Sequence, residues 1–143
     1  MSGTAELDLL VVGGGVAGAT AAITAAELGA RVAVVEKLPR LGGSCPYSAG
    51  NLLQLDGPNA LERLRAMSFS RTPDDVLAAY LGGLAGVREW LTSEGALTVD
   101  ADPLVLPNCW PNLPGADGVT YYSVADGPGG PALWSVMERA LRR

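Results

Sequence analysis

The chain has 143 residues, of which 48% are hydrophobic and 17% charged, and its formal net charge at neutral pH is −5. This composition is typical of a globular domain, because a disordered chain has too few apolar side chains to build a core. The acidic balance, without a basic cluster in the sequence, argues against nucleic acid and anionic membranes as partners. There is no histidine, which excludes a Ser-His-Asp triad and most zinc sites.

The cysteines and the apolar runs indicate where the protein works. Cys45 and Cys109 are too few for a disulfide framework. No apolar run is long enough to span a bilayer, and the first residues lack the basic and apolar parts of a secretory signal. We therefore expect a cytoplasmic protein that binds no metal, no nucleic acid and no membrane.

Residues 7–36 have the pattern of a strand, a glycine turn, a helix and a second strand. The run LDLLVV predicts a strand that is buried on both faces. An alanine-rich helix follows, and Gly29 is placed to end it. The second strand, residues 31–35, has Glu36 directly after it. These elements together predict a βαβ unit.

Three glycines of this unit, Gly13, Gly15 and Gly18, have the G-x-G-x-x-G spacing. The first allows a tight turn, the second lets a pyrophosphate approach the backbone, and the third lets the helix pack closely on the strand. The helix N-terminus offers N–H groups to the phosphates. Glu36 can accept hydrogen bonds from the ribose hydroxyls and would repel a 2′-phosphate, which argues against NADP. We expect a bound adenine dinucleotide; the alternative is a βαβ unit with incidental glycines.

Residues 37–52 are predicted to form a loop that runs back towards the phosphates. Pro39 and the pair Gly42-Gly43 break any regular structure. Ser44 and nearby N–H groups can bind pyrophosphate oxygens. The small residues that follow suit backbone that lies flat against a large planar ring. The alternative interpretation is an ordinary surface loop.

The pattern GGGxxGxxxAxxxxxxGxxVxxxEK, followed by Gly-Gly-Ser and then Ser-Ala-Gly, resembles FAD-binding oxidoreductases of the fumarate reductase and 3-ketosteroid dehydrogenase group. Asn51 departs from the further glycine often found in that group. The pyridine-nucleotide disulfide reductases are a second resemblance, through Gly-Gly-x-Cys. Their second cysteine position is Gly50 here, so Cys45 cannot form the redox disulfide and this branch is rejected. Cys45 is then a small loop filler rather than a redox thiol or a flavin attachment point.

The resemblance implies FAD as the cofactor and a set of residues that bind it. The set consists of the two glycine turns, the acidic tip and the small segment after the second turn: Gly13, Gly15, Val16, Ala17, Gly18, Glu36, Lys37, Gly42, Gly43, Ser44, Cys45, Ser48, Ala49 and Gly50. It assigns no catalytic residue to this chain.

Two helices are predicted after the loop. The first lies within residues 56–68, and the second begins with Thr72 as N-cap and Pro73 as the first helical residue. Asp74 and Asp75 follow, and we interpret them as helix-stabilising charges rather than as an acid–base pair.

Residues 101–131 contain six of the ten prolines and are expected to be irregular. Their aromatic side chains, Trp110, Tyr121 and Tyr122, either pack within this segment, which we favour, or face an apolar substrate. A final helix is predicted for residues 131–142, with Pro131 at its start.

The predicted fold class is α/β: an incomplete Rossmann-like FAD-binding domain with a parallel sheet and an α-helical insertion. Its parts are the βαβ unit 7–36, the flavin loop 37–52, the helical insertion 56–95, the Pro-rich segment 101–131 and the final helix 131–142. Members of the group are several times longer, so the resemblance implies that another polypeptide supplies the rest of the FAD domain and the substrate domain. A cut or truncated longer protein is the other explanation.

The resemblance implies the FAD-binding part of an oxidoreductase that dehydrogenates or reduces an activated C–C bond in a small molecule, with a steroid-like ketone as one option. The alternatives are a non-catalytic flavin-binding or assembly subunit and, third, a plain NAD-dependent Rossmann protein.

Overall fold

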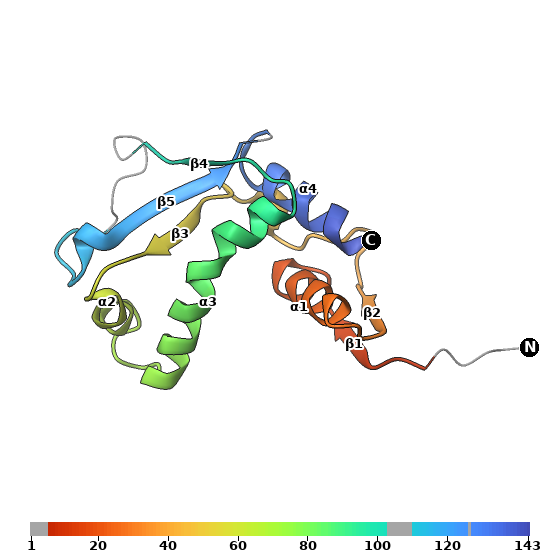
Figure 1. Cartoon of the computed structure of the whole chain (residues 1–143), viewed down its shortest axis with the longest axis horizontal. Helices are drawn as coiled ribbons and strands as arrows, with labels where there is room; N and C mark the ends of the chain where they lie inside the picture. The colour runs from red at the N-terminus through yellow and green to blue at the C-terminus, as the bar shows by residue number, and fades with distance from the viewer. Residues whose placement is uncertain (1–5, 103–109, 126) are drawn as a thin grey trace, which may run out of the picture. The chain divides into compact units, whose positions relative to one another are not determined.

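The structure is a computed structural model, and it describes residues 6–102, 110–125 and 127–143. Helices and strands alternate along the chain (Figure 1). In chain order the elements are β1 (Leu9–Val12), α1 (Val16–Glu27), β2 (Val32–Val35), the 3-10 helix η1 (Cys45–Tyr47), β3 (Leu52–Leu55), α2 (Ala60–Met67), α3 (Asp74–Ser93), β4 (Thr98–Asp100), the 3-10 helix η2 (Ala116–Gly118), β5 (Val119–Val124) and α4 (Gly129–Leu141).

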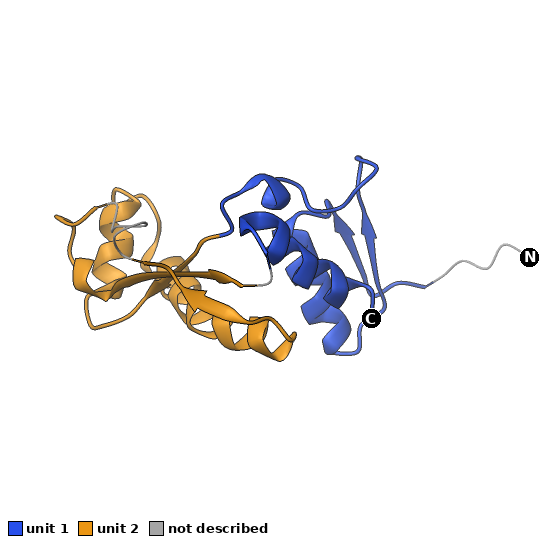
Figure 2. Ribbon diagram, turned by 90° about the horizontal axis from the view of Figure 1, so that it is seen from above, with its two compact units in different colours: residues 1–50, 127–143 blue, residues 51–126 orange. Residues whose placement is uncertain are grey.

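The chain folds into two compact units. The first comprises residues 1–50 and 127–143, and the second comprises residues 51–126 (Figure 2). The second unit is therefore an insertion between two parts of the first.

The first unit contains the βαβ arrangement that the sequence predicts. β1 and β2 pair in parallel, in a register that runs from Leu9 opposite Val32 to Val12 opposite Val35. α1 connects the two strands and packs against both, and α4 packs beside α1. The α/β fold with a parallel sheet is confirmed.

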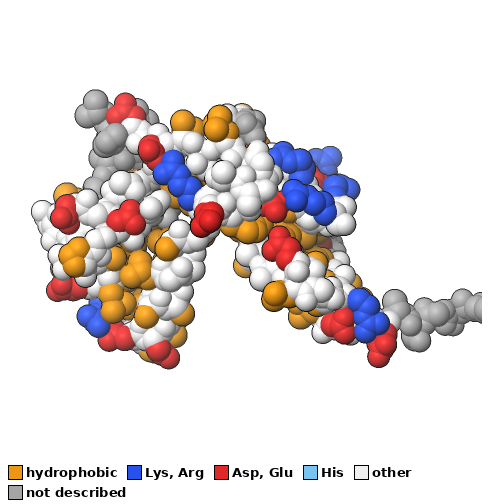
Figure 3. All heavy atoms as spheres, viewed as in Figure 1, with side chains coloured by type: hydrophobic (Ala, Val, Ile, Leu, Met, Phe, Trp, Pro, Cys, Tyr) orange, Lys and Arg blue, Asp and Glu red, His pale blue; other side chains and the backbone are white. Residues whose placement is uncertain are grey.

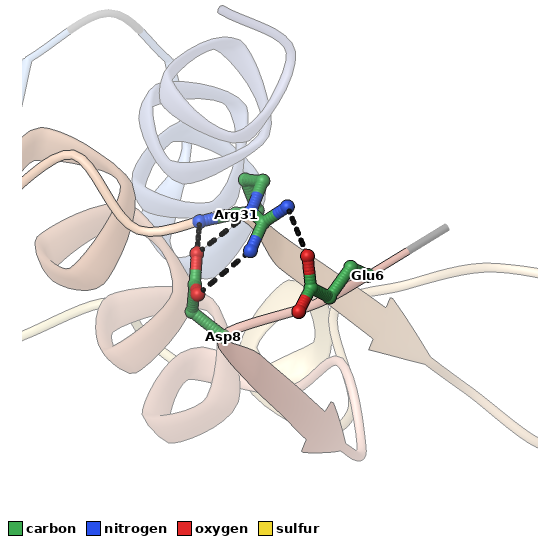
Figure 4. A network of polar contacts seen from close by, with 3 residues as sticks. All are labelled: Glu6, Asp8 and Arg31. Carbon is green, nitrogen blue, oxygen red and sulfur yellow. Dashed lines mark hydrogen bonds and ion pairs between the residues drawn. The ribbon is translucent and has the colours of Figure 1, made fainter. Parts of the chain in front are cut away.

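An ion-pair network joins the starts of the two parallel strands (Figure 4). The Asp8 carboxylate accepts hydrogen bonds from the backbone N–H of Arg31 at 2.8 Å and from its Nε at 3.0 Å, and Glu6 lies 3.4 Å from the same guanidinium. The Arg31 side chain accordingly holds the pKa of Asp8 below its ordinary value. Since parallel strands start at the same end of a sheet, this network lies at the end opposite the glycine turn.

Close contact between α1 and β1 depends on Gly18. A Cβ at this position would overlap the carbonyl oxygen of Gly13 and would lie 3.1 Å from Val11 Cγ1. The helix face that is buried carries Ala19, Ala22 and Ile23. The packing role that the sequence predicts for Gly18 is therefore confirmed.

The second unit holds a three-stranded antiparallel sheet in the order β3-β5-β4, together with α2 and α3. Its apolar core is formed by Leu55, Ala60, Leu64 and Leu77. The prediction that residues 101–131 are irregular is wrong for β5, and the predicted helical insertion also contains strands. The sequence of β5, VTYYSV, is rich in β-branched and aromatic residues that favour strands, despite the prolines on both sides.

Arg88 of α3 joins that helix to the sheet of the second unit. Its guanidinium lies 5.0 Å from the centre of the Tyr122 ring, its Nε donates to Thr98 Oγ1 at 3.0 Å, and Nη1 pairs with Asp100 at 2.7 Å. Tyr122 is 1% exposed, and burial raises the pKa of its hydroxyl. This agrees with the packing interpretation of Tyr122, whereas Trp110 is 53% exposed.

The beginnings of two helices differ from the prediction by one or two residues. Pro73, not Thr72, is the N-cap of α3, because its ψ of 147° is extended rather than helical. α4 begins at Gly129 rather than at Pro131. Asp74 lies in the first turn of α3, where it also pairs with Arg65 at 2.7 Å, so its predicted helix-stabilising role is confirmed.

Among the residues that the structure describes, no helix is both long enough and apolar enough to cross a lipid bilayer.

We predict that Gly18→Ala lowers the free energy of unfolding by about 1–3 kcal/mol, because the new methyl group has to displace backbone. The matched control is Gly86→Ala in α3, where a Cβ would meet nothing within 4 Å. There the substitution is expected to raise stability by about 0.5–1 kcal/mol through helix propensity. Urea unfolding of both variants provides the comparison, and equal effects would contradict the close packing of α1 on β1.

Candidate cofactor site

The first glycine turn leaves open space in front of the N-terminus of α1. Gly13, with φ of +102°, turns the chain out of β1, and Gly15 is the extended N-cap of the helix. The nearest atom to a Cβ placed at Gly15 would be the Cα of Gly43, at 3.9 Å. This turn therefore presents the free N–H groups of the helix start beside a space that no side chain fills, which suits a phosphate group.

The second glycine turn packs its backbone against the first. The N–H of Gly42 donates to the carbonyl of Gly14 at 2.8 Å, and Gly42 forms a parallel bridge with Gly15. A Cβ at Gly43, where φ is +55°, would lie 3.2 Å from the Cα of Gly15. The predicted return of the loop towards the phosphate-binding turn is confirmed.

Glu36 lies at the carboxyl ends of the two parallel strands. Its Oε2 accepts a hydrogen bond from the N–H of Gly14 at 2.8 Å, and its Oε1 accepts one from the N–H of Leu38 at 2.9 Å. These two donors, Gly14 first, hold the pKa of Glu36 below its ordinary value. A hollow of about 450 Å³ beside the carboxylate is lined by Val12, Gly13, Val35, Glu36 and Lys37.

The segment after the second turn is attached to the start of α4. The Ser48 hydroxyl donates to the carbonyl of Cys45 at 2.8 Å, and the N–H of Gly130 donates to the carbonyl of Ser48 at 3.0 Å. Cys45 is a buried free thiol whose Sγ lies 3.7 Å from the carbonyl oxygen of Gly130, and burial raises its pKa. These features agree with Cys45 as a loop filler and argue against a reactive thiolate.

Comparison with known families decides what this arrangement is. The family model described as FAD dependent oxidoreductase matches residues 8–113, which is most of the chain. The chain belongs to the FAD dependent oxidoreductase family. FAD is therefore the cofactor to which the two glycine turns and Glu36 have to be compared.

Curated relatives in this comparison include dehydrogenases of two kinds. The chain is 42% identical over 81 residues to a 3-oxosteroid 1-dehydrogenase of Mycolicibacterium smegmatis, covering 57% of this chain and 13% of that protein. It is 38% identical over 86 residues to a 3-oxosteroid 1-dehydrogenase of Rhodococcus opacus, covering 60% of this chain and 17% of that protein. A shorter match, 54% over 44 residues, is to a dihydrolipoyl dehydrogenase of Manduca sexta and covers 31% of this chain and 9% of that protein.

A solved structure shares the fold. The 3-ketosteroid-Δ4-(5α)-dehydrogenase of Rhodococcus jostii RHA1, in complex with 4-androstene-3,17-dione, superposes with a TM-score of 0.68 at 18% sequence identity. The match covers 95% of this chain and 36% of that chain. The resemblance to the 3-ketosteroid dehydrogenase group is confirmed, and the chain spans less than a fifth of the length of the curated relatives it matches.

The residues present fit FAD. The open space at Gly15 leaves room for a pyrophosphate next to the backbone. The Glu36 carboxylate has about four lone-pair positions, of which backbone N–H groups occupy one on each oxygen, so both oxygens can still accept a ribose hydroxyl. Val16 and Ser44 are exposed at the edges of the two turns. The predicted cofactor residues thus fall into two groups, one around the glycine turns and one at the start of α4.

Two features of the site were not found by reasoning from the sequence. One is the internal use of the Ser48 hydroxyl, and the other is the pairing of the loop with Gly129 and Gly130. The Gly-Pro-Gly-Gly run at residues 127–130 was the available signal, since consecutive glycines often mark close approach of backbone. Lys and Arg side chains gather over α4 (Figure 3), and the helix carries Arg139 in its last turn, where a cation interacts favourably with the helix dipole.

We predict that the contribution of Glu36 to stability depends on pH. Because the pKa of Glu36 is lower in the folded chain than its ordinary value of 4.5, its contribution is fully present above that pH and is lost as the pH falls through the folded value. Urea unfolding from neutral to acidic pH should show a constant difference between wild type and Glu36→Gln at first. That difference should shrink below the ordinary value, and a difference independent of pH would contradict the two backbone hydrogen bonds.

Proposed function

We propose that this chain binds and orients FAD in an oxidoreductase that dehydrogenates or reduces an activated carbon–carbon bond in a small organic molecule, with steroid-like ketones as a candidate substrate class. The observation that carries the proposal is the pair of backbone-bonded glycine turns in front of α1, in a chain of the FAD dependent oxidoreductase family. The names of the 3-oxosteroid 1-dehydrogenase relatives support the substrate class.

Each part of the site has a separate task in this proposal. The free N–H groups at the start of α1 and the backbone at Gly15 hold the pyrophosphate, and Glu36 holds the adenosine ribose. Gly42 to Ser44 close the opposite side of the phosphates, and residues 48–50 lie along the ring system. When bound, FAD supplies the hydride-accepting centre, and this chain contributes binding and orientation. We assign the catalytic acid or base to no residue of this chain.

We also propose that a second polypeptide supplies the remaining strands of the FAD domain and the substrate domain. Strands of parallel sheets are normally covered on both faces by other elements. Here Leu10 is 54% exposed, Val12 80% and Val35 46%, so β1 and β2 present an apolar surface. A further polypeptide that pairs with and covers these strands would remove this surface from water.

We predict that Gly15→Val removes FAD without unfolding the chain. A Cβ fits at Gly15 and its φ of −75° suits any residue, but the side chain would occupy the space in front of the helix. The affinity for FAD should fall by about a hundredfold or more, equivalent to about 3 kcal/mol. Flavin absorbance after gel filtration measures retention, and circular dichroism checks the fold; flavin retained in the variant would refute the pyrophosphate placement.

Native size-exclusion chromatography with mass spectrometry tests the second polypeptide. We expect this chain to co-purify with another chain and a flavin, and Leu10→Lys to abolish the association because it places a charge on the apolar strand surface. Leu28→Lys is the matched control, since Leu28 is 83% exposed at the end of α1, away from the strands. A stable monomer that retains FAD would overturn this part of the proposal. Absence of turnover after reconstitution would favour a non-catalytic flavin-binding subunit.

A further inference from the structure

We infer that the first residues of α4 set the shape of the flavin loop, and that Ser48 and Cys45 are positioning residues in this device rather than ligands of the cofactor. The inference deepens the proposed function and rests on it, because it concerns the loop that is assigned to the flavin ring. It changes the role of Ser48, which the sequence predicts to be a direct ligand.

The backbone of Gly130 is tied to the loop in both directions. Its N–H donates to the carbonyl of Ser48 at 3.0 Å, and its carbonyl oxygen accepts from the thiol of Cys45 at 3.7 Å. One residue of α4 is therefore bonded to both ends of the segment Cys45–Ser48, from the start of η1 to its C-cap. The loop cannot shift against the helix without breaking these contacts.

Glycines on both sides make this contact sterically exclusive. A Cβ at Gly130 would overlap the carbonyl oxygen of Cys45 and would lie 2.7 Å from Ser48 Oγ. A Cβ at Gly50 would overlap the carbonyl carbon of Gly129, and one at Gly129 would lie 2.8 Å from the carbonyl oxygen of Ala49. The two backbones are interlocked so closely that a side chain on any of these glycines has to push them apart.

The hydroxyl of Ser48 is used within the loop. It donates to the carbonyl of Cys45 at 2.8 Å and accepts from the N–H of Gly50 at 3.2 Å. A serine hydroxyl has a single proton to donate, so it has none left for a cofactor oxygen. Its task is to fix the turn that presents Ala49, which is exposed.

α4 is a firm support for this turn. Ala132, Val136 and Met137 on the same helix are buried at or below 4% exposure, and α4 packs against both α1 and η1. The helix that carries the phosphate-binding N-terminus and the helix that holds the flavin loop are thus packed together. A loop that is fixed before the cofactor arrives costs less ordering free energy on binding.

The test compares Ser48→Ala and Gly130→Ala with the matched control Ser135→Ala, in the complete protein with every co-purifying chain. Ser135 is also on α4, but its hydroxyl bonds only to the carbonyl of Ala132 in its own helix. Hydrogen exchange of the cofactor-free protein is the first measurement. We expect faster exchange at the amides of Gly50 and Gly130 in Ser48→Ala and no change at these amides in Ser135→Ala.

Flavin binding and flavin spectra are the second measurement. Loss of one hydrogen bond predicts an affinity for FAD about three- to tenfold lower in Ser48→Ala, with a shifted visible circular dichroism band and midpoint potential. Cys45→Ser, which keeps a donor towards Gly130, should retain the wild-type spectrum, whereas Cys45→Ala should not. A merely structural role would lower stability and leave the spectrum of the bound flavin unchanged.

The outcomes separate the inference from the proposed function. If wild type binds FAD while Ser48→Ala has unchanged exchange, affinity and spectrum, the positioning role is overturned and the proposed function stands. If wild type binds no FAD in the complete protein, the proposed function fails and the inference fails with it. Faster exchange together with a shifted flavin spectrum supports the inference.

Discussion

The contact between the backbones of two glycine turns is the constraint on which the first unit depends. The 2.8 Å hydrogen bond from Gly42 to Gly14 brings the loop after β2 onto the turn after β1. This approach leaves little room for side chains, since a Cβ at Gly43 would already be 3.2 Å from Gly15. The same turn supplies the N–H of Gly14 to the Glu36 carboxylate, so one short segment orders the phosphate region, the ribose acceptor and the start of the flavin loop together.

Reasoning from the sequence works where structure is determined locally. The βαβ unit at residues 7–36 follows from hydrophobic runs and glycine spacing within one stretch of chain, and Gly18 lies where that spacing requires it. β5 was missed because its partner β3 lies far away in the sequence and the prolines around it argue against regular structure. The attachment of the loop to α4 was missed for the same reason: Ser48 and Gly130 are brought together only by the tertiary fold.

The glycines of this chain fall into two kinds, which the sequence does not distinguish. Gly50 and Gly130 have backbone atoms where a Cβ would be, so close packing explains them. Gly82, Gly83 and Gly86 lie within α3, and among the described residues nothing is within 4 Å of a Cβ at these positions. A helical glycine lowers stability by about 0.5–1 kcal/mol relative to alanine. Packing within the described residues does not explain these three.

The contact between Gly50 and Gly129 has a consequence for how this architecture can change over evolutionary time. The chain leaves the first unit after Gly50 and returns to it at residue 127, and these two points touch. Segments whose ends meet can be lengthened, shortened or replaced with little disturbance of the domain that carries them. The cofactor-holding unit can therefore remain nearly constant while residues 51–126 diverge, so that new specificities can arise by exchange of one inserted module.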